Sequence, residues 1–581
     1  MKGGLAGSAM LLAACGGDEE KGATGTESVR AGQAAGTAAS QPKAGGIIKD
    51  STSQDVPTFD TLAARAAITN SIGGFAYNRL LKFKPGRESF ADGTLESDAI
   101  TKYEQPDELT LIMYMRQGMK LDPRTPTNGR TLTTEDITLS WEKFAREGTY
   151  RADIARSANQ DASVESLRAS DASTIEIKLA FPDGQLLPSM NFWGGFWAMP
   201  KEGLTGGFDP ATTVRGGGPW LLERYQPSVG FSFRKNPNFY DAATAPLVDG
   251  IEMPIIQDTA QVAAQLKAKG IYFGAGGRGG AIPASDMLTL KRDIRSTRIG
   301  LTAPTVEGNC LSFSWRESNP YRDVRVRKAI SMLIDRDTFI DLFYDLKNFQ
   351  ANDVEMQAYW NSPLSGGWGP YWLNPKDPKF GPAANNYMFN VAEAKKLLTA
   401  AGYPDGFETP LTFVAGADYG RDWGQRAEAL MSMLSQGGIR AKANAVDYAA
   451  VWIPQYLRSQ GDFDGLAMYP NGSRGDPGQW LFVFFASAGA NNQSAKNFPE
   501  LDALIVKQRR ELDQTRRITV FHDIQRYFAE HIPTVPQGGG TEVPVLIWEG
   551  MHGPDENFGW SGGVPGAELY PKYWLDDSLR G

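Results

Sequence analysis

Strand-like and helix-like hydrophobic patterns alternate along the chain from about residue 45 onward, and this alternation limits the fold most. Segment 174–180, TIEIKLA, places apolar residues at every second position, which is typical of a strand with one buried face. Segment 129–146 contains Thr133 and Asp136 at the spacing of a helix capping box, followed by apolar residues at helical spacing. No internal repeat interrupts the alternation, so the pattern predicts a mixed α/β protein.

Further segments extend this pattern. Segments 45–50 and 108–115 are strand-like, and segment 220–236 predicts two strands on either side of Pro227 and Ser228. Asn390 and Glu393 predict the start of a helix, and segment 518–533 predicts another that ends before Pro533.

The chain is too long for one hydrophobic core. With 581 residues we expect two or more lobes, each with its own buried interior. The net charge of −8 argues against nucleic acid as the main partner, because no positive field would attract phosphates. After residue 14, no stretch approaches the roughly 18 unbroken apolar residues that a membrane-spanning helix requires.

The N-terminal segment has the features of an export signal. An apolar run follows Lys2 and ends in Leu12-Ala13-Ala14-Cys15, which is similar to the lipobox of bacterial lipoproteins, in which the cysteine is acylated. Residues 1–15 are therefore expected to be a signal peptide with Cys15 as the lipidation site. Residues 16–44 are rich in Gly, Ala, Thr and Ser, which predicts a flexible tether to the outer face of the membrane.

Five segments resemble, in the right order, the extracytoplasmic solute-binding proteins of family 5, which serve peptide- and nickel-type ABC transporters. The resemblance runs from about residue 45 to about residue 540. The matching segments are AYNRLLKF (76–83), the strand and helix within 108–144, RGGGPWLLERYQPSVGFSFRKNPNFYD (215–241), YRDVRVRKAISMLIDRDTFID (321–341) and NVAEAKKLLTAAGYPDGF (390–407).

The resemblance implies an α/β fold of two lobes, the class II periplasmic-binding-protein type of the large peptide binders, with an extra subdomain in the first lobe. By analogy, the first lobe takes residues 45–300 and a C-terminal return over 535–581, and the second lobe takes residues 301–534. The chain would cross between the lobes near 296–308 and 531–539. A ligand that contacts both lobes favours their closed arrangement, which a membrane permease then recognises.

The same resemblance implies a binding function without catalysis or cofactor, in a protein that is usually monomeric. We expect a small solute, an ABC permease and a lipid anchor as partners, and peptides are favoured over oligosaccharides and metal chelates. An extracytoplasmic hydrolase is the alternative from another class.

Aromatic side chains and one loop of the second lobe provide the candidate ligand-binding residues. Tryptophans near Gly and Pro, in NFWGGFWAMP and YWNSPLSGGWGPYW, suit the wall of a cleft. Peptide binders of the family carry a carboxylate for the peptide amino group in a segment that corresponds to 468–482. Here Ser473 occupies that position, and Asp476 is the nearest acid. The candidate residues are Trp193, Trp197, Trp360, Tyr469, Asn471, Arg474, Asp476 and Trp480.

The sequence gives weaker support to a reactive cysteine, a metal site or a dinucleotide-binding site. Cys310 lies in a strand-like run and is expected to be buried, and the three histidines lack the spacing of a metal site. Segment 274–279, GAGGRG, fits a dinucleotide-binding pattern, but Pro283 falls where the next helix would begin. No metal site is therefore predicted.

Overall fold

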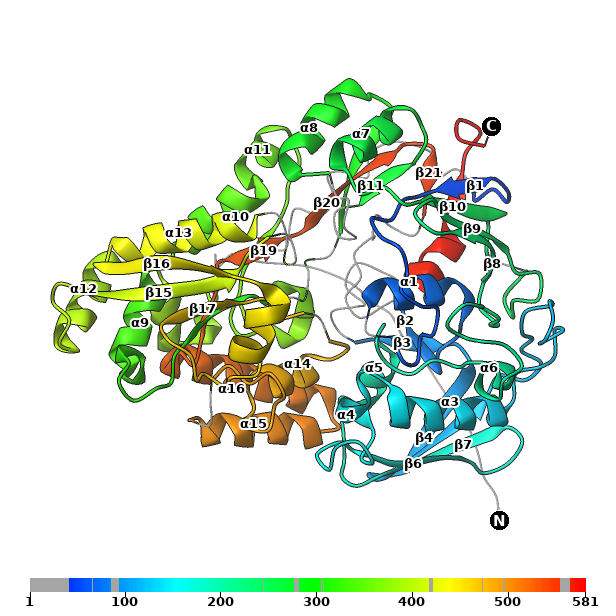
Figure 1. Ribbon diagram of the computed structural model, residues 1–581, viewed down its shortest axis with the longest axis horizontal. Coiled ribbons are helices and arrows are strands. Elements are labelled where there is room, and N and C mark those ends of the chain that lie inside the picture. The colour runs from blue at the N-terminus through cyan, green and yellow to red at the C-terminus, as the bar shows by residue number, and fades with distance from the viewer. Residues whose placement is uncertain are drawn as a thin grey trace, which may run out of the picture. The chain divides into compact units, whose positions relative to one another are not determined.

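The computed structural model describes residues 41–580 apart from 65, 85–92, 244, 276–281, 303, 305, 307, 417–418, 420–421, 473, 495–496 and 554–564 (Figure 1). Residues Lys43–Gly581 form one compact unit. The expected signal peptide, Cys15, most of the tether, Ser473 and most of the GAGGRG segment lie outside the described residues. In the part of the chain that is described, no helix is long and apolar enough to cross a bilayer.

Buried apolar side chains form two large clusters, which we call the first core and the second core. The first core takes its members from Ile48 to Ile294 and from Val545 to Leu579, together with Phe349 and Met356. The second core takes its members from Val306 to Val535. Apart from Phe349 and Met356, the chain therefore builds the first core, then the second, and returns to the first at its C-terminal end.

One four-stranded sheet and two pairs of short strands belong to the first core. One sheet has the order β1-β10-β9-β8, in which only β1 and β10 are parallel. Its strands are β1 (Ile47–Lys49), β8 (Trp220–Gln226), β9 (Gly230–Lys235) and β10 (Gly250–Pro254). The short strands β2 (Leu81–Phe83) and β3 (Leu95–Ser97) pair with each other, as do β21 (Met551–His552) and β22 (Trp574–Leu575).

A separate antiparallel sheet with the order β4-β5-β7-β6 forms a subdomain on the first core. Its strands are β4 (Ile100–Asp107), β5 (Thr110–Met115), β6 (Val164–Ala169) and β7 (Thr174–Leu179). Helix α3 (Thr134–Glu147) packs against β6, as Figure 1 shows. Apolar residues alternate along β7, with Ile175, Ile177 and Leu179 buried, so one face of the sheet joins the core.

The remaining helices around the first core are mostly short. They are α1 (Ala67–Ala76), α4 (Arg151–Ile154), α5 (Leu186–Asn191), α6 (Lys201–Leu204), α7 (Thr259–Lys267), α8 (Ala284–Asp293), α17 (Pro565–Glu568) and η6 (Tyr570–Lys572).

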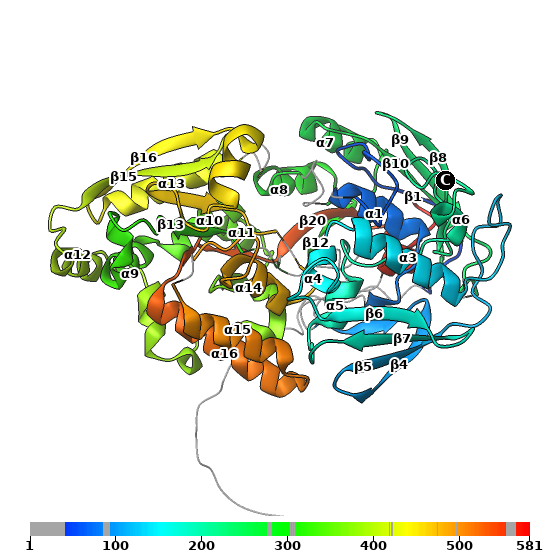
Figure 2. The same ribbon diagram turned by 60° about the horizontal axis from the view of Figure 1, so that its bottom comes forward.

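The second core surrounds a mixed sheet with the order β16-β15-β17-β13-β18. Its strands are β13 (Cys310–Phe313), β15 (Phe407–Val414), β16 (Ile439–Val446), β17 (Leu466–Tyr469) and β18 (Val535–Pro536). Strand β15 is parallel to β16 and β17, and β13 is antiparallel to β17 and β18. Helix α13 (Trp423–Ser435) packs on β15 and β16, and α15 (Pro499–Arg510) lies beside α16 (Gln514–His531) (Figure 2).

Further elements complete this part of the chain. They are α9 (Val324–Leu333), α10 (Arg336–Tyr344), α11 (Leu346–Ala351), α12 (Val391–Ala400), α14 (Pro477–Phe485), the 3₁₀ helices η1 (Pro320–Arg322), η2 (Gly366–Tyr371), η3 (Pro378–Phe380) and η4 (Pro382–Tyr387), and the π-helix η5 (Tyr448–Leu457).

Two chain crossings connect the cores. The first leads from β12 (Thr297–Thr302) to β13, and the second leads from β18 through β19 (Gly539–Thr541) to β20 (Val543–Trp548). Strand β20 lies between β12 and β11 (Phe273–Ala275), so the two crossings meet in one sheet at the first core. On the second-core side, β18 pairs with β13, and β19 pairs with β14 (Ala358–Trp360).

Local sequence signals correspond well to these elements. The capping box of Thr133 and Asp136 starts α3, and the side chain of Asn390 caps α12 by accepting from the Glu393 N–H. The two strands expected around Pro227 are β8 and β9, and the expected helix 518–533 is α16. That helix begins at Gln514, four residues earlier than expected, because Asp513 caps it.

Candidate functional site

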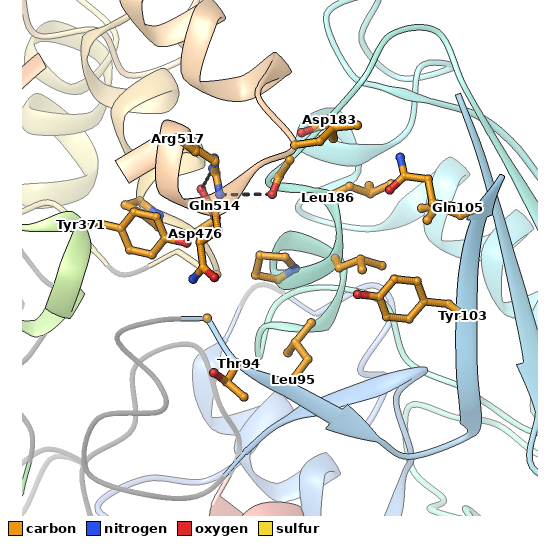
Figure 3. Close-up of a pocket in the computed structure, with 18 of the residues that line it drawn as sticks. Thr94, Leu95, Tyr103, Gln105, Asp183, Leu186, Tyr371, Asp476, Gln514 and Arg517 are labelled. Atoms are coloured by element: carbon orange, nitrogen blue, oxygen red, sulfur yellow. Dashed lines mark hydrogen bonds and ion pairs between the residues drawn. The ribbon is translucent and has the colours of Figure 1, made fainter. Parts of the chain in front are cut away.

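A cavity of about 350 Å³ lies between side chains of the two cores, and we call it the inter-core cavity. The first core and its subdomain contribute Thr94, Leu95, Tyr103 and Gln105, and the loop and helix over 183–188. The second core contributes η2 and the first residues of α14 and α16. Figure 3 shows Tyr103 and Gln105 across the cavity from Asp476, Gln514 and Arg517.

A buried ion pair forms one wall of the inter-core cavity. The two Nη atoms of Arg517 donate to the two carboxylate oxygens of Asp476, at 2.9 and 2.5 Å (Figure 3). Both side chains are almost fully buried. Asp476 also caps α14, where its Oδ1 accepts from the Gly478 N–H and Pro477 takes the first helical position. Its negative charge is therefore already compensated by the protein.

A second buried ion pair joins segments from the two cores. Arg509 on α15 donates to Asp183 Oδ2 at 3.1 Å through Nη2 and to the Asp161 carbonyl at 2.8 Å. The Gly184 N–H donates to the Arg509 carbonyl, and Arg517 donates to the Gly184 carbonyl. Segments from the subdomain and from the α15–α16 pair are thus connected by several polar contacts.

A third polar contact between the two parts involves Asp153 on α4. The amide of Gln479 on α14 donates to Asp153 Oδ2 at 2.9 Å. Burial raises the pKa of the Asp153 carboxyl above its ordinary value, although Arg474, Gln479 and Arg509 act in the opposite direction. This carboxyl therefore holds a proton more readily than an exposed aspartic acid.

A smaller cavity of about 230 Å³ borders both chain crossings, and we call it the crossing cavity. The crossings contribute Pro304, Asn309, Gln537 and the segment 539–543, and the second core contributes α13 and the loops near Asn361 and Gly366. The cavity also borders an ion pair, in which Arg426 Nε donates to Asp422 Oδ2 at 2.6 Å.

The predicted tryptophans are all buried, in different places. Trp193 and Trp197 belong to the first core, where the Arg79 guanidinium lies over the Trp197 ring. Trp360 donates to Asp337 Oδ1 at 2.6 Å, and Trp480 packs against Phe484 and Phe485 in the second core. None of these four lines either cavity.

The predicted residues of the 468–482 segment are also separated by the fold. The Tyr469 hydroxyl donates to the Tyr456 carbonyl, and Asn471 accepts from Gln493 and contacts the Cys310 sulfur. Arg474 is half-buried, and its guanidinium lies over the rings of Tyr150 and Phe484. Of the eight predicted residues only Asp476 lines a described cavity, and the ligand-binding role of the set stays a prediction.

Most of the residues that line the two cavities are not among the residues predicted from the sequence. Trp368 and Tyr371 line the inter-core cavity and lie in the tryptophan-rich segment YWNSPLSGGWGPYW. The aromatic composition of this segment therefore indicated part of the cavity wall. Arg517 and Gln537 carried no local signal. Among the described residues, no group of three or more His, Cys, Asp or Glu side chains could hold a metal ion.

Two cores joined by two chain crossings, with cavities at the crossings and between the cores, define the architecture of a periplasmic binding protein. A family model for "Bacterial extracellular solute-binding proteins, family 5 Middle" matches residues 94–492, so the chain belongs to this solute-binding family, whose members are not enzymes.

Relatives and solved structures agree with this membership. The chain is 24% identical to Di/tripeptide-binding protein 1 of Pseudomonas aeruginosa, over 79% of this chain and 82% of the relative. It is 23% identical to Heme-binding protein A of Haemophilus influenzae, over 79% and 81%. The periplasmic binding protein DppA from Helicobacter pylori, in complex with the peptide STSA, superimposes with a TM-score of 0.68 at 18% identity, over 92% of this chain and 99% of that one.

Proposed function

We propose that this solute-binding protein captures an oligopeptide-like solute between its two lobes and delivers it to an ABC permease. In this proposal the lobes are residues 45–300 with 535–581, and residues 301–534. The two buried cores support this division. Phe349 and Met356, from residues 301–534, pack into the first core and so connect the second lobe to it. A ligand that contacts both lobes stabilises their closed arrangement by its differential affinity.

The observation that carries the peptide assignment is the charge balance of the inter-core cavity. Each charged side chain among its described lining residues is paired, Asp476 with Arg517 and Asp183 with Arg509. The other polar lining groups are neutral, such as Tyr103, Gln105 and Gln514. A neutral polar wall with aromatic and aliphatic side chains suits peptide units, which carry both a donor and an acceptor.

The paired state of Asp476 bears on how a peptide is held. A free amino group would compete with Arg517 for the same two oxygens, and breaking a buried ion pair is costly. Hydrogen bonds to the peptide backbone, without a salt bridge from Asp476 to the amino terminus, are therefore the expected mode of recognition. Among the similar proteins above, Di/tripeptide-binding protein 1 is named for peptides and the DppA structure contains one, whereas Heme-binding protein A is named for heme.

We also propose that Cys15 carries a lipid that holds the protein at the outer face of the membrane. The Leu12-Ala13-Ala14-Cys15 motif and the Gly- and Ala-rich segment that follows it support this part of the proposal. Two or more acyl chains give stable membrane attachment, whereas a single chain does not.

One purification tests both parts. The wild-type chain and Cys15→Ala are expressed in a bacterial host, and we expect wild type in the membrane fraction with an acyl mass on Cys15 and the variant in the aqueous fraction. Solute released from the variant by denaturation is identified by mass spectrometry, and short peptides are expected.

The recovered solute is then added back to the stripped variant. At a concentration a hundredfold above Kd it should raise the free energy of unfolding by about 2.7 kcal/mol and remain chemically unchanged. Recovery of an oligosaccharide or a metal chelate would contradict the peptide assignment, and conversion of the solute would contradict a binding function.

A further inference from the structure

One hydrogen bond across the boundary between the two cores involves a titratable group. The Gln479 amide on α14 donates through Nε2 to Asp153 Oδ2 on α4, and these two helices lie side by side in both views (Figure 1, Figure 2). Asp153 is half-buried, and Gln479 is 1% exposed. A proton on this carboxyl therefore changes a contact between the two proposed lobes.

The other end of the same amide lacks a donor. Gln479 Oε1 is buried and accepts no hydrogen bond from the described residues. An ionised carboxylate only accepts, so it cannot satisfy this oxygen, whereas a protonated carboxyl carries one O–H donor. A carboxylic acid and an amide can pair through two parallel hydrogen bonds. A protonated Asp153 therefore offers a second hydrogen bond across the boundary, to an acceptor that is costly to leave unsatisfied.

The titratable neighbours of Asp153 come from both sides of the boundary. Arg474, in the loop before α14, and Arg509 on α15 favour the ionised carboxylate, and Tyr150 precedes α4 on the side of Asp153. Both arginines have other contacts, because Arg509 binds Asp183 and the Arg474 guanidinium lies over the Tyr150 ring. Burial outweighs the two positive charges and raises the pKa of Asp153, in agreement with the unsatisfied acceptor beside it.

We propose that protonation of Asp153 stabilises the arrangement in which the two lobes are in contact, so that acidic surroundings favour capture of the solute. When α14 and α15 move away from α4, the carboxyl returns to water and regains its ordinary acidity. The closed population, and with it the affinity for solute, should therefore decrease as pH rises from about 4 through the raised pKa of the closed state. The inference rests on the proposed closure of the lobes and not on the identity of the solute.

Single-molecule energy transfer on the Cys15→Ala chain, stripped of solute, tests the inference. Dyes are attached at Val229→Cys and Leu342→Cys, which are exposed positions in the first and the second lobe. Cys310 stays unlabelled, because it is buried and its burial raises the pKa of the thiol to about 12. The ratio of closed to open molecules is then measured at about pH 5 and about pH 7.5.

With Asp153 in place, the closed-to-open ratio should be about threefold or more higher at the lower pH. Asp153→Asn keeps an acceptor and a donor for Gln479 without ionising, so its ratio should differ by less than about twofold between the two pH values. Gln479→Glu should steepen the pH dependence, because two facing carboxylates repel each other near neutral pH and share a proton in acid. Asp161→Asn is the matched control, since Asp161 is exposed and only its carbonyl contacts Arg509, and it should retain the full pH dependence.

Three results would overturn the inference: a ratio that does not fall as pH rises, the same fall in Asp153→Asn, or an unaltered pH dependence in Gln479→Glu. Thermal unfolding of each variant verifies that it is folded, and Gln479→Glu keeps the test valid if Asp153→Asn is unstable. Closure on adding the recovered peptide, together with a pH-independent ratio, overturns this inference alone. A pH-dependent ratio that requires Asp153, together with a recovered oligosaccharide, overturns the peptide assignment alone.

Discussion

Among the single charged side chains of this protein, Asp153 is instructive because burial raises its pKa. Its partner Gln479 comes from the other part of the chain, and burial opposes the ionised form. The folded protein therefore binds a proton at this site more tightly than the unfolded chain does. By linkage, this group lowers stability as pH rises from the ordinary aspartate pKa, about 4, through the raised pKa of the folded state.

Asp153→Asn tests this relation. Asparagine keeps an oxygen that can accept from Gln479 and cannot ionise, so the variant should be more stable than wild type at pH 7 and equally stable near pH 3.5. Denaturant unfolding at both pH values measures the difference. Asp161→Asn, a change at an exposed aspartate, is the control. A loss of stability at pH 7 would contradict the argument.

At the scale of elements, Asp136 shows how one side chain can organise two helices. Its fully buried carboxylate accepts from the Thr133 N–H at the start of α3, from the Lys201 N–H at the start of α6, and from both Nη atoms of Arg130. Burial acts to raise the pKa of Asp136, but these donors outweigh it and the pKa is lowered. The stability it provides is present above the unfolded pKa and is lost as pH falls through the folded one.

Asp136→Asn should destabilise the protein by about 3 kcal/mol at pH 7, because the amide N–H₂ replaces an acceptor and Arg130 loses a buried anionic partner. Urea unfolding gives the value. Glu202→Gln removes the other, more exposed carboxylate bound to Arg130 and should cost much less. Similar losses in the two variants would show that Asp136 does not have this organising role.

For the whole molecule, we expect the contacts between the two cores to determine how easily the proposed lobes separate. Asp183 and Arg509 form a buried pair across this boundary, supported by backbone contacts at Gly184. Asp183→Asn leaves the Arg509 guanidinium without its anionic partner. We expect a larger radius of gyration of the solute-free protein by small-angle X-ray scattering, and at least fivefold weaker solute binding, because less of the population is closed.

Glu530→Gln is the control for Asp183→Asn, since Glu530 forms a more exposed ion pair with Lys328, and both residues lie within 301–534. It should change neither the radius of gyration nor the affinity. An unchanged radius in Asp183→Asn would mean that the pair does not contribute to closure.

Local signals in the sequence were sufficient for many of the elements. The capping box at Thr133, the alternation in β7 and the helix start at Asn390 each depend on residues within one or two turns, and each is confirmed. Family membership could also be predicted from local sequence, because five short segments that resemble the family occur in the family's order along the chain.

The candidate binding residues were harder to predict. Trp193 and Trp197 lie in a Gly-interrupted segment that is typical of a cleft wall, yet they pack into the first core, where large rings bury the most area. Asp476 pairs with Arg517, 41 residues later, and no local pattern indicates that pairing. The inter-core cavity combines Thr94 with Arg517, and the crossing cavity combines Asn361 with Gln537.

The sequence by itself thus determined the α/β class, the need for more than one core, many of the helix and strand positions and the family. These depend on periodicity, capping and chain length, which act over short distances or on the chain as a whole. Only the tertiary structure decided which charges are neutralised, which aromatic rings are buried and which buried polar atoms remain unpaired. The reason is physical: those properties arise when segments hundreds of residues apart come together and exclude water.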